Sequence, residues 1–221
     1  MNTPDVFSDL VSIGEDSVRR LDQHPVGAQL VRGQLSRPAY AHYLTQAVHQ
    51  VRESGPFLER TGVAFERLGR PDLAALFLRK AGEEDGHHLW ALDDLAALGV
   101  SADAVERTPL SSAVEAYKAW ARYASEAAPI GIIGLAFTLE WLSYARAGQA
   151  ADNLVAHSGI DGIANAVRFL RAHGDADGGH IEAFRPVVAR ITDPDEIELL
   201  LLSARLTATL YLGFLTDPQP R

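Results

Sequence analysis

The chain has 221 residues and no cysteine, and it carries a formal net charge of −9 at pH 7. The length allows one domain over residues 1–221 with a well-buried core, and the acidic charge without a lysine or arginine cluster argues against nucleic acid as a partner. The lack of cysteine excludes disulfides, thiolate metal ligands and cysteine nucleophiles, so any metal must be bound through nitrogen and oxygen.

The N-terminal residues, MNTPDVFSDL, lack the basic and apolar regions of a signal peptide. No segment of the chain approaches the ~20 consecutive apolar residues that cross a membrane. We therefore expect a cytoplasmic protein that has no membrane partner.

Apolar residues recur every three or four positions over long stretches, which predicts an all-α fold. Ser36-Arg37-Pro38 supplies an N-cap and an early proline for a helix from Tyr40 to about Leu68, which is expected to kink at Gly55-Pro56. The next helix is expected to start at Arg70-Pro71-Asp72 and to continue to Leu98, with Gly99 as its C-cap.

Pro109 opens a further predicted helix that runs to about Ala127, and Pro129 starts a strongly apolar helix that ends near Gly148. Two more helical segments cover about Asp161–Thr192 and Asp195–Leu215. Because the chain contains no internal repeat or flexible linker, we expect a single helical bundle of seven or more helices.

His173, Asp177 and His180 form an H-x-x-x-D-x-x-H pattern. On an α-helix, offsets of four and seven residues return to within about 40° of the starting direction, so the three side chains share one face. Two imidazoles and a carboxylate at one point are typical of a first-row transition-metal site. The alternative is a solvated helix face, which the three glycines within the motif favour because glycine weakens a helix interior.

Two further carboxylates and a histidine are candidate ligands. Glu84 and His87 stand three residues apart on a predicted helix. Helical bundles use this spacing to present a carboxylate and an imidazole to a pair of metal ions. The neighbouring His88 leaves the choice of histidine open. Glu140 interrupts an otherwise apolar stretch, where an unpartnered carboxylate would cost several kcal/mol. A salt bridge is the alternative role for Glu140, but Arg146 on the same helix is nearly two turns away.

Three carboxylates and three histidines suit two iron or manganese ions with open positions for dioxygen, whereas zinc is more often satisfied by four ligands. The predicted metal ligands are Glu84, His87, Glu140, His173, Asp177 and His180. His49 and Glu53, one turn apart, are candidates for an additional ligand or for a residue that holds a ligand by a hydrogen bond. The expected pocket walls are Ile132, Ile133, Leu135, Phe137 and Trp141.

With these residues assembled, the chain resembles the haem-oxygenase-like diiron oxidase and oxygenase superfamily, whose fold is shared with TENA/thiaminase II and PQQ-synthesis proteins. The resemblance runs from about His24 to Tyr211 and rests on HPVGAQLVRGQLSRPAYAHYLTQAVHQV, EEDGHHLWALDDLAALG, PIGIIGLAFTLEW and FLRAHGDADGGH. It implies the same six ligands. Many members carry a further glutamate near Gln50. With glutamine at that position, the extra ligand is either absent or replaced by His49 or Glu53, and Gln50 itself points about 100° away from His49.

The resemblance implies a non-haem diiron oxidase or oxygenase with two labile Fe(II) ions, which uses dioxygen to oxidise an amino-acid-like or fatty-acid-like small molecule. The sequence assigns neither the substrate nor a catalytic residue, and it is compatible with a homodimer. One alternative is a haem-binding or haem-degrading protein with His24 as axial ligand. Another is a metal-independent TENA-like protein, for which a catalytic cysteine would be expected, and a third is a structural helical domain. The haem and structural alternatives leave Glu140 unexplained.

Overall fold

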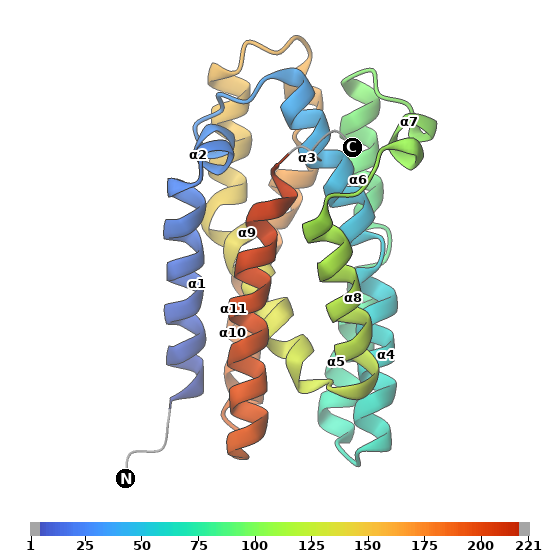
Figure 1. The fold of residues 1–221 in the computed structure, drawn as a ribbon, viewed down its shortest axis with the longest axis vertical. Coiled ribbons are helices and arrows are strands. Elements are labelled where there is room, and N and C mark those ends of the chain that lie inside the picture. Colours follow the sequence, from blue (N-terminus) through green and yellow to red (C-terminus); the bar gives the residue numbers. More distant parts are fainter. Residues whose placement is uncertain (1–4, 217–221) are drawn as a thin grey trace.

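The computed structural model describes residues 5–216, apart from the side chains of residues 175–180. The described chain contains helices and no strand, which confirms the predicted all-α bundle (Figure 1). The helices are α1 (Val6–Gln23), α2 (Pro25–Val31), α3 (Arg37–Val51), α4 (Ser54–Arg67), α5 (Pro71–Glu83), α6 (His87–Ala97), α7 (Ala102–Arg107), α8 (Ser112–Ala127), α9 (Ile130–His157), α10 (Arg168–Val188) and α11 (Pro194–Phe214), with a short 3₁₀ turn at Ile163–Asn165.

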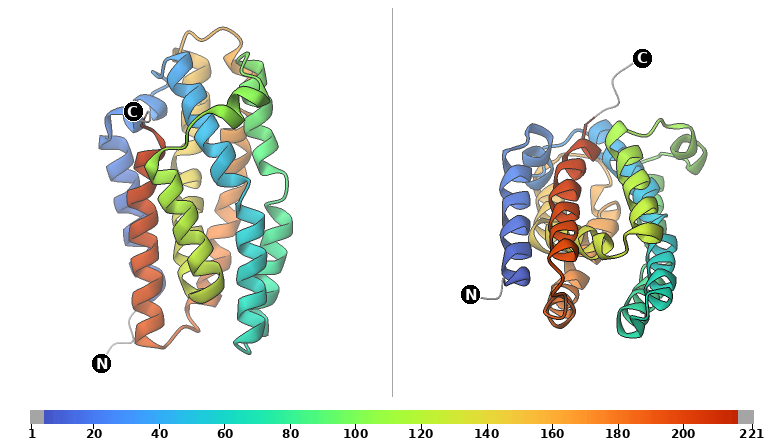
Figure 2. Two further views of the ribbon diagram at one scale, coloured as in Figure 1. Left: turned by 45° about the vertical axis from the view of Figure 1, so that its right-hand side comes forward. Right: turned by 60° about the horizontal axis from the view of Figure 1, so that its bottom comes forward.

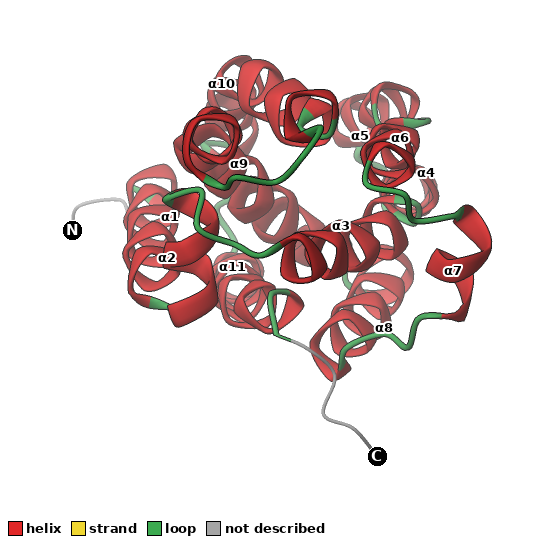
Figure 3. Cartoon of the chain, turned by 90° about the horizontal axis from the view of Figure 1, so that it is seen from above, coloured by secondary structure: helices red, strands yellow, loops and turns green. Residues whose placement is uncertain are grey.

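The long helices run roughly along the long axis of the molecule (Figures 1 and 2). The apolar helix α9 packs against α10, α11 and α1, while α4 pairs with α5 and α3 pairs with α6. The view along the long axis shows α7 at the rim of the bundle, away from α9 and α10 (Figure 3). The central position of α9 follows from its sequence, because a helix that is apolar on most sides is stable only when neighbours cover it.

Several of the helix boundaries expected from the sequence are wrong. The first long helix breaks before Ser54 rather than at Gly55-Pro56, so Pro56 falls in the first turn of α4, where its missing N–H costs no hydrogen bond. The helix expected over residues 70–98 is divided between α5 and α6, since Gly86 adopts φ +82°. Helix α9 does not end near Gly148 but continues to His157.

Buried apolar residues form two clusters. One joins α4, α5, α8 and the first half of α9 to α10 and α11. The other joins α2, α3 and α6 to the second half of α9. A cavity lies where the two clusters meet, since its walls include Phe57 and Leu135 from the first and Tyr43 and Val51 from the second.

Helix α11 corrects one expectation from the sequence, that no segment approaches the length of a membrane span. By length and composition, Pro194–Phe214 meets that criterion. In the fold, however, α11 packs along α9, α1 and α8, and it buries Leu200, Ala204 and Phe214. The core helix of a bundle has the same composition, so this one helix is weak evidence for a membrane.

Candidate metal centre

Three of the predicted ligands converge at one point. Glu84 follows the last residue of α5, His87 is the first residue of α6, and His173 comes from α10. One ligand atom from each side chain lies within 4.8 Å of the others. The turn between α5 and α6 therefore does what a single helix was expected to do, since it holds Glu84 and His87 toward the same side. His88 is not a member of this group.

The imidazole of His173 is oriented by its own helix. Its Nδ1 lies 2.9 Å from the backbone carbonyl of Phe169, and because a carbonyl oxygen only accepts, Nδ1 must carry the proton and donate. The lone pair is then on Nε2, the nitrogen through which such a histidine can bind a metal. Phe169 also packs against the His173 ring, with ring centroids 4.5 Å apart.

The side chains of His87 and Glu84, the other two members of the group, are in contact with each other. The His87 ring stacks on Trp90 at 4.1 Å between centroids, and its Nδ1 lies 3.3 Å from Oε2 of Glu84. Burial raises the pKa of the Glu84 carboxyl, but contact with His87 and the charges of His173 and Lys80 outweigh it, so the pKa lies below its usual value. Glu84 is therefore ionised at neutral pH, the form that binds a metal ion.

Glu140, on α9, faces the same cavity and is paired with a lysine. The Lys80 ammonium donates to Oε1 of Glu140 at 2.8 Å, and the two side chains are only 6% and 13% exposed. Burial raises the pKa of Glu140 to about 7, although Lys80 acts in the opposite direction. Lys80 was not among the residues predicted for the site. A signal was available, because Lys80 continues the buried stripe of Leu73, Leu76 and Phe77 at helical spacing.

The side chains of Asp177 and His180 lie outside the described part of the structure, so the assignment of these two residues as ligands stays a prediction. The backbone of both residues belongs to α10, the helix that carries His173. Four of the six predicted ligands can therefore be located, and three of those form the close group.

His49 and Glu53 are not brought to the centre. His49 Nε2 lies 3.2 Å from the carbonyl oxygen of Val105, and a Glu53 oxygen lies 3.8 Å from the ammonium of Lys118. Gln50, expected to point away, lines the cavity instead and donates to the Tyr117 hydroxyl at 3.2 Å. The sequence correctly separated Gln50 from His49 around the helix, but it gave no information on which of the two faces is buried.

The cavity beside Glu84, Glu140 and His173 has a volume of about 100 Å³. Of the predicted wall residues, Ile132 and Leu135 line it. Ile133 and Phe137 belong to the apolar core, and Trp141 stacks on Phe137 at 5.6 Å between centroids. Polar groups on the walls are supplied by Tyr43, Gln50, Ser54, Tyr117, Ser143 and Tyr211. The space is sufficient for several water molecules or a small organic molecule.

His24, considered as a haem ligand, caps α2 instead. Its Nδ1 accepts a hydrogen bond from the Gly27 N–H at 3.3 Å. The described residues that line the cavity do not include His24.

The donor set of the close group fits iron. Two imidazoles and one carboxylate, with room for further ligands, are typical of non-haem Fe(II) centres that use dioxygen. The group borders a mostly apolar cavity, so a bound ion could meet both a protein ligand set and a small molecule.

Comparison with solved structures gives the class of fold. A domain of unknown function with a haem oxygenase-like fold from Shewanella denitrificans OS217 matches with TM-score 0.79 and 18% identity, over 94% of this chain and 88% of that one. A TenA homologue from Pseudomonas syringae pv. tomato DC3000 matches with TM-score 0.75 and 13% identity, over 96% of this chain and 92% of that one. A TenA homologue from P. horikoshii OT3 matches with TM-score 0.74 and 15% identity, over 96% of this chain and 97% of that one. The protein has a haem oxygenase-like fold.

The sequence of residues 41–212, which is more than half of the chain, matches the model of a family described as iron-containing redox enzymes. The chain belongs to this family. No curated protein matches it.

Proposed function

We propose that the protein is a cytoplasmic non-haem diiron oxidase or oxygenase, which uses dioxygen to oxidise a small molecule. The observation that carries this proposal is the group of Glu84, His87 and His173, of which Glu84 and His173 line a mostly apolar cavity. Glu140, Asp177 and His180 complete the proposed set of six ligands. Manganese is compatible with the same nitrogen and oxygen donors.

The residues of the chain have distinct roles in this proposal. Glu84, His87 and His173 would hold one ion, and Phe169 keeps the His173 ring in the tautomer that presents Nε2. When bound, iron supplies the one-electron redox chemistry that allows dioxygen to react with a closed-shell organic molecule. The apolar walls limit the access of water to the reacting groups.

The lining of the cavity supports a small substrate with both an apolar part and a polar group, either amino-acid-like or fatty-acid-like. Leu58, Ile132, Leu135 and Leu139 would contact the apolar part. Two hydroxyl-containing pairs, Tyr43 with Tyr211 and Gln50 with Tyr117, are available to hydrogen-bond the polar group. Ligand pockets of this kind obtain their specificity from a few such polar groups.

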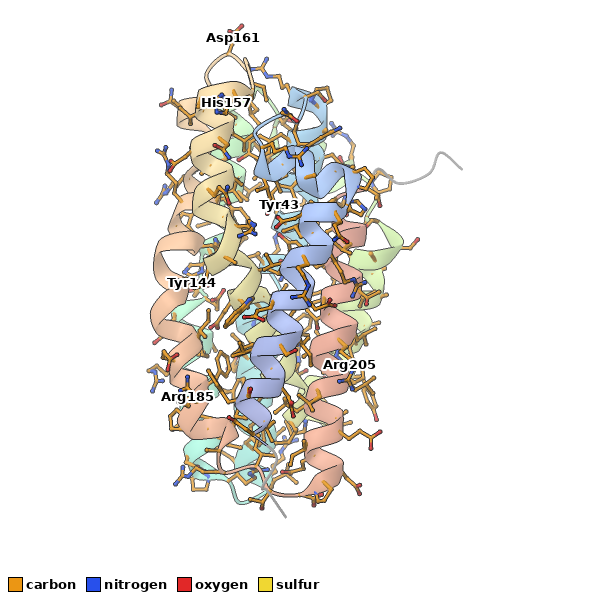
Figure 4. The ribbon with its side chains drawn as sticks, turned by 90° about the vertical axis from the view of Figure 1, so that its left-hand side faces the viewer. Tyr43, Tyr144, His157, Asp161, Arg185 and Arg205 are labelled. Atoms are coloured by element: carbon orange, nitrogen blue, oxygen red, sulfur yellow. The ribbon has the colours of Figure 1, made fainter. Side chains whose placement is uncertain are left out.

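Anaerobic Fe(II) titration followed by a pulse of oxygen, read by optical and Mössbauer spectroscopy, tests the proposal. We expect His87→Ala and His173→Ala to lose tight binding of at least one iron, because water replaces a lost ligand only weakly. His157→Ala is the control, since His157 lies near one end of the bundle, beside the Asp161 loop (Figure 4). Equal iron binding by all three variants would exclude the proposed ligands.

The same series separates the haem-based alternative. A haem Soret band on addition of haem, from a protein that binds no Fe(II), would favour a haem protein. A wild-type protein that binds neither iron nor haem would favour a metal-independent role like that considered for TENA relatives.

A further inference from the structure

A lysine ammonium lies inside the proposed metal site. Lys80 lines the same cavity as Glu84, Glu140 and His173. It is one of only two lysines in the chain, and its side chain is 6% exposed. Lysine is among the residues that proteins bury least often unless a partner is present. Its position on the buried face of α5 therefore calls for an account beyond packing.

The contacts of Lys80 show what holds it there. Its Nζ donates to Oε1 of Glu140 at 2.8 Å and lies 5.0 Å from the centre of the Phe184 ring, a cation–π distance. Its charge also acts on Glu84, because it contributes to lowering the pKa of that carboxyl. The ammonium is thus a fixed positive charge that acts on two of the carboxylates proposed as ligands.

A metal ion and an ammonium compete for the same carboxylate oxygen. Lys80 already neutralises Glu140, and its charge repels any cation that approaches this side of the cavity. The group of Glu84, His87 and His173 is less affected, since its two imidazoles can bind a metal while neutral. The two halves of the proposed site are therefore unequal before any metal binds.

We infer that Lys80 is a built-in cation that controls how many metal ions the protein holds. One divalent ion binds at Glu84, His87 and His173 with Lys80 in place, and a second binds only by displacing the Lys80 ammonium from Glu140. This inference rests on the proposed metal-binding function and concerns the order and strength of binding, not the reaction.

Titration of the metal-free protein with Co(II), followed by visible absorption and calorimetry, tests the inference. We expect the wild type to bind one Co(II) ion tightly and to bind a second with an affinity at least about tenfold lower. Lys80→Met keeps the length of the side chain without its charge, so the second affinity should rise about tenfold while the first changes less than about threefold. Lys80→Gln, which keeps a donor for Glu140, provides a second neutral variant in case Lys80→Met folds poorly.

Two controls isolate the effect of the charge. Lys80→Arg retains the charge and should bind the two ions as unequally as the wild type. Lys118→Met removes the only other lysine, which pairs with Glu53 outside the centre, and should leave both affinities unchanged. A rise in the second affinity in both Met variants would mean that net charge, not the position of Lys80, is responsible, and would overturn the inference.

The wild type offers a readout that does not depend on a variant. Protein labelled with ¹⁵N-lysine contains two side-chain ammonium groups, so Lys80 can be followed during titration with diamagnetic Zn(II). The Lys80 signal should persist through the first equivalent and shift during the second. If the two ions bind with equal affinity, or if the second equivalent leaves the Lys80 signal unchanged, the inference about Lys80 is wrong but the proposed function is not affected. A wild type that binds no metal would instead refute the proposed function.

Discussion

At the residue scale, the pair of Lys80 and Glu140 shows that the sequence can indicate a buried charged residue, whereas only the fold identifies its partner. The sequence marks Glu140 because a carboxylate interrupts an apolar stretch, but it offers Arg146 as the nearest cation. In the structure, Arg146 bonds to Asp22 of α1 at 2.6 Å. The cation beside Glu140 comes from α5, 60 residues earlier. A helical pattern can indicate that both residues are buried, but not that they meet.

This pair reverses an expectation about Glu140→Gln. From the sequence alone, the substitution should not lower the melting temperature of the metal-free protein, because no partner for the carboxylate was identified. With Lys80 in contact, we expect a loss of about 3 kcal/mol or more in the free energy of unfolding, because the substitution leaves a buried ammonium without its counter-ion. Urea denaturation of the metal-free protein measures it.

A double-mutant cycle provides the control for this prediction. Lys80→Met alone should also destabilise, whereas Lys80→Met combined with Glu140→Gln removes both charges and should recover most of the loss. If the two single effects simply add, the pair does not interact in solution.

At the scale of elements, the turn between α5 and α6 is the feature that sequence periodicity did not reveal. Leu73 to Leu98 carries helical spacing throughout, so the pattern predicts one helix. The chain instead stops α5 at Glu83 and restarts at His87, with Gly86 at φ +82° between them. A glycine within a helical pattern is ambiguous, because it either weakens the helix or ends it. Here the glycine ends the helix, and the resulting turn brings Glu84 and His87 together.

Gly86→Ala should therefore destabilise the protein by about 1 kcal/mol and weaken metal binding at His87. The added methyl group has space, with Leu89 Cδ1 3.8 Å away, so the cost comes from the backbone conformation. Gly82→Ala is the matched control, since Gly82 is helical with nothing within 4 Å of the added atom, and it should be neutral or slightly stabilising. Thermal denaturation with and without Co(II) compares the two, and equal behaviour would contradict the role of the turn.

Asp94 connects the two helices that carry the predicted ligands His87 and His173. Its carboxylate, fully buried on α6, accepts from the backbone N–H groups of Arg168 and Phe169 at 3.0 and 2.9 Å, at the start of α10. Burial raises the pKa of Asp94 to about 6, against the lowering effect of those two hydrogen bonds. The contact fixes the start of the helix that presents His173 relative to the helix that presents His87.

The raised pKa of Asp94 predicts a pH dependence. Between the usual Asp value of 3.8 and about 6, the unfolded chain releases the proton first. The stability that Asp94 contributes is therefore fully present below pH 3.8 and is lost as the pH rises to about 6. Asp94→Asn cannot titrate, so the stability of the wild type relative to this variant should be greater at pH 5 than at pH 7.5. Denaturant unfolding at both pH values measures the difference, and a constant difference would show that Asp94 keeps an ordinary pKa.

At the scale of the whole molecule, the class of fold was predictable because it depends on patterns that extend over many residues. Apolar spacing indicated the all-α bundle, and Ser36 and Pro129 correctly marked the starts of α3 and α9. The end of α9 was wrong because Gly148 was interpreted as a stop. In the candidate site, residue types indicated a metal centre, but the choice of Gln50 over His49 as the cavity residue depends on helix rotation, which only packing fixes.

Gly148 and Gly174 are explained together by the packing of α9 on α10. A Cβ atom at Gly174 would lie 2.7 Å from the backbone nitrogen of Gly148, so the two backbones approach too closely for any side chain at Gly174. Gly174 is one of the three glycines within the H-x-x-x-D-x-x-H pattern, and from the sequence it was expected to weaken the helix. In the fold it allows the close approach of the helix with Glu140 to the helix with His173.

We predict that Gly174→Ala separates α9 from α10 and lowers the free energy of unfolding by about 1–3 kcal/mol, the usual cost of overpacking. Metal affinity should fall with it, because the substitution is adjacent to His173 and moves that ring relative to Glu84 and His87. Gly148→Ala places its methyl group in open space and should leave metal affinity unchanged and stability equal or slightly higher. Thermal denaturation and Co(II) titration of the two variants test this directly. If Gly174→Ala retains wild-type metal affinity despite the loss of stability, then the centre is positioned by α5, α6 and the start of α10 without help from α9.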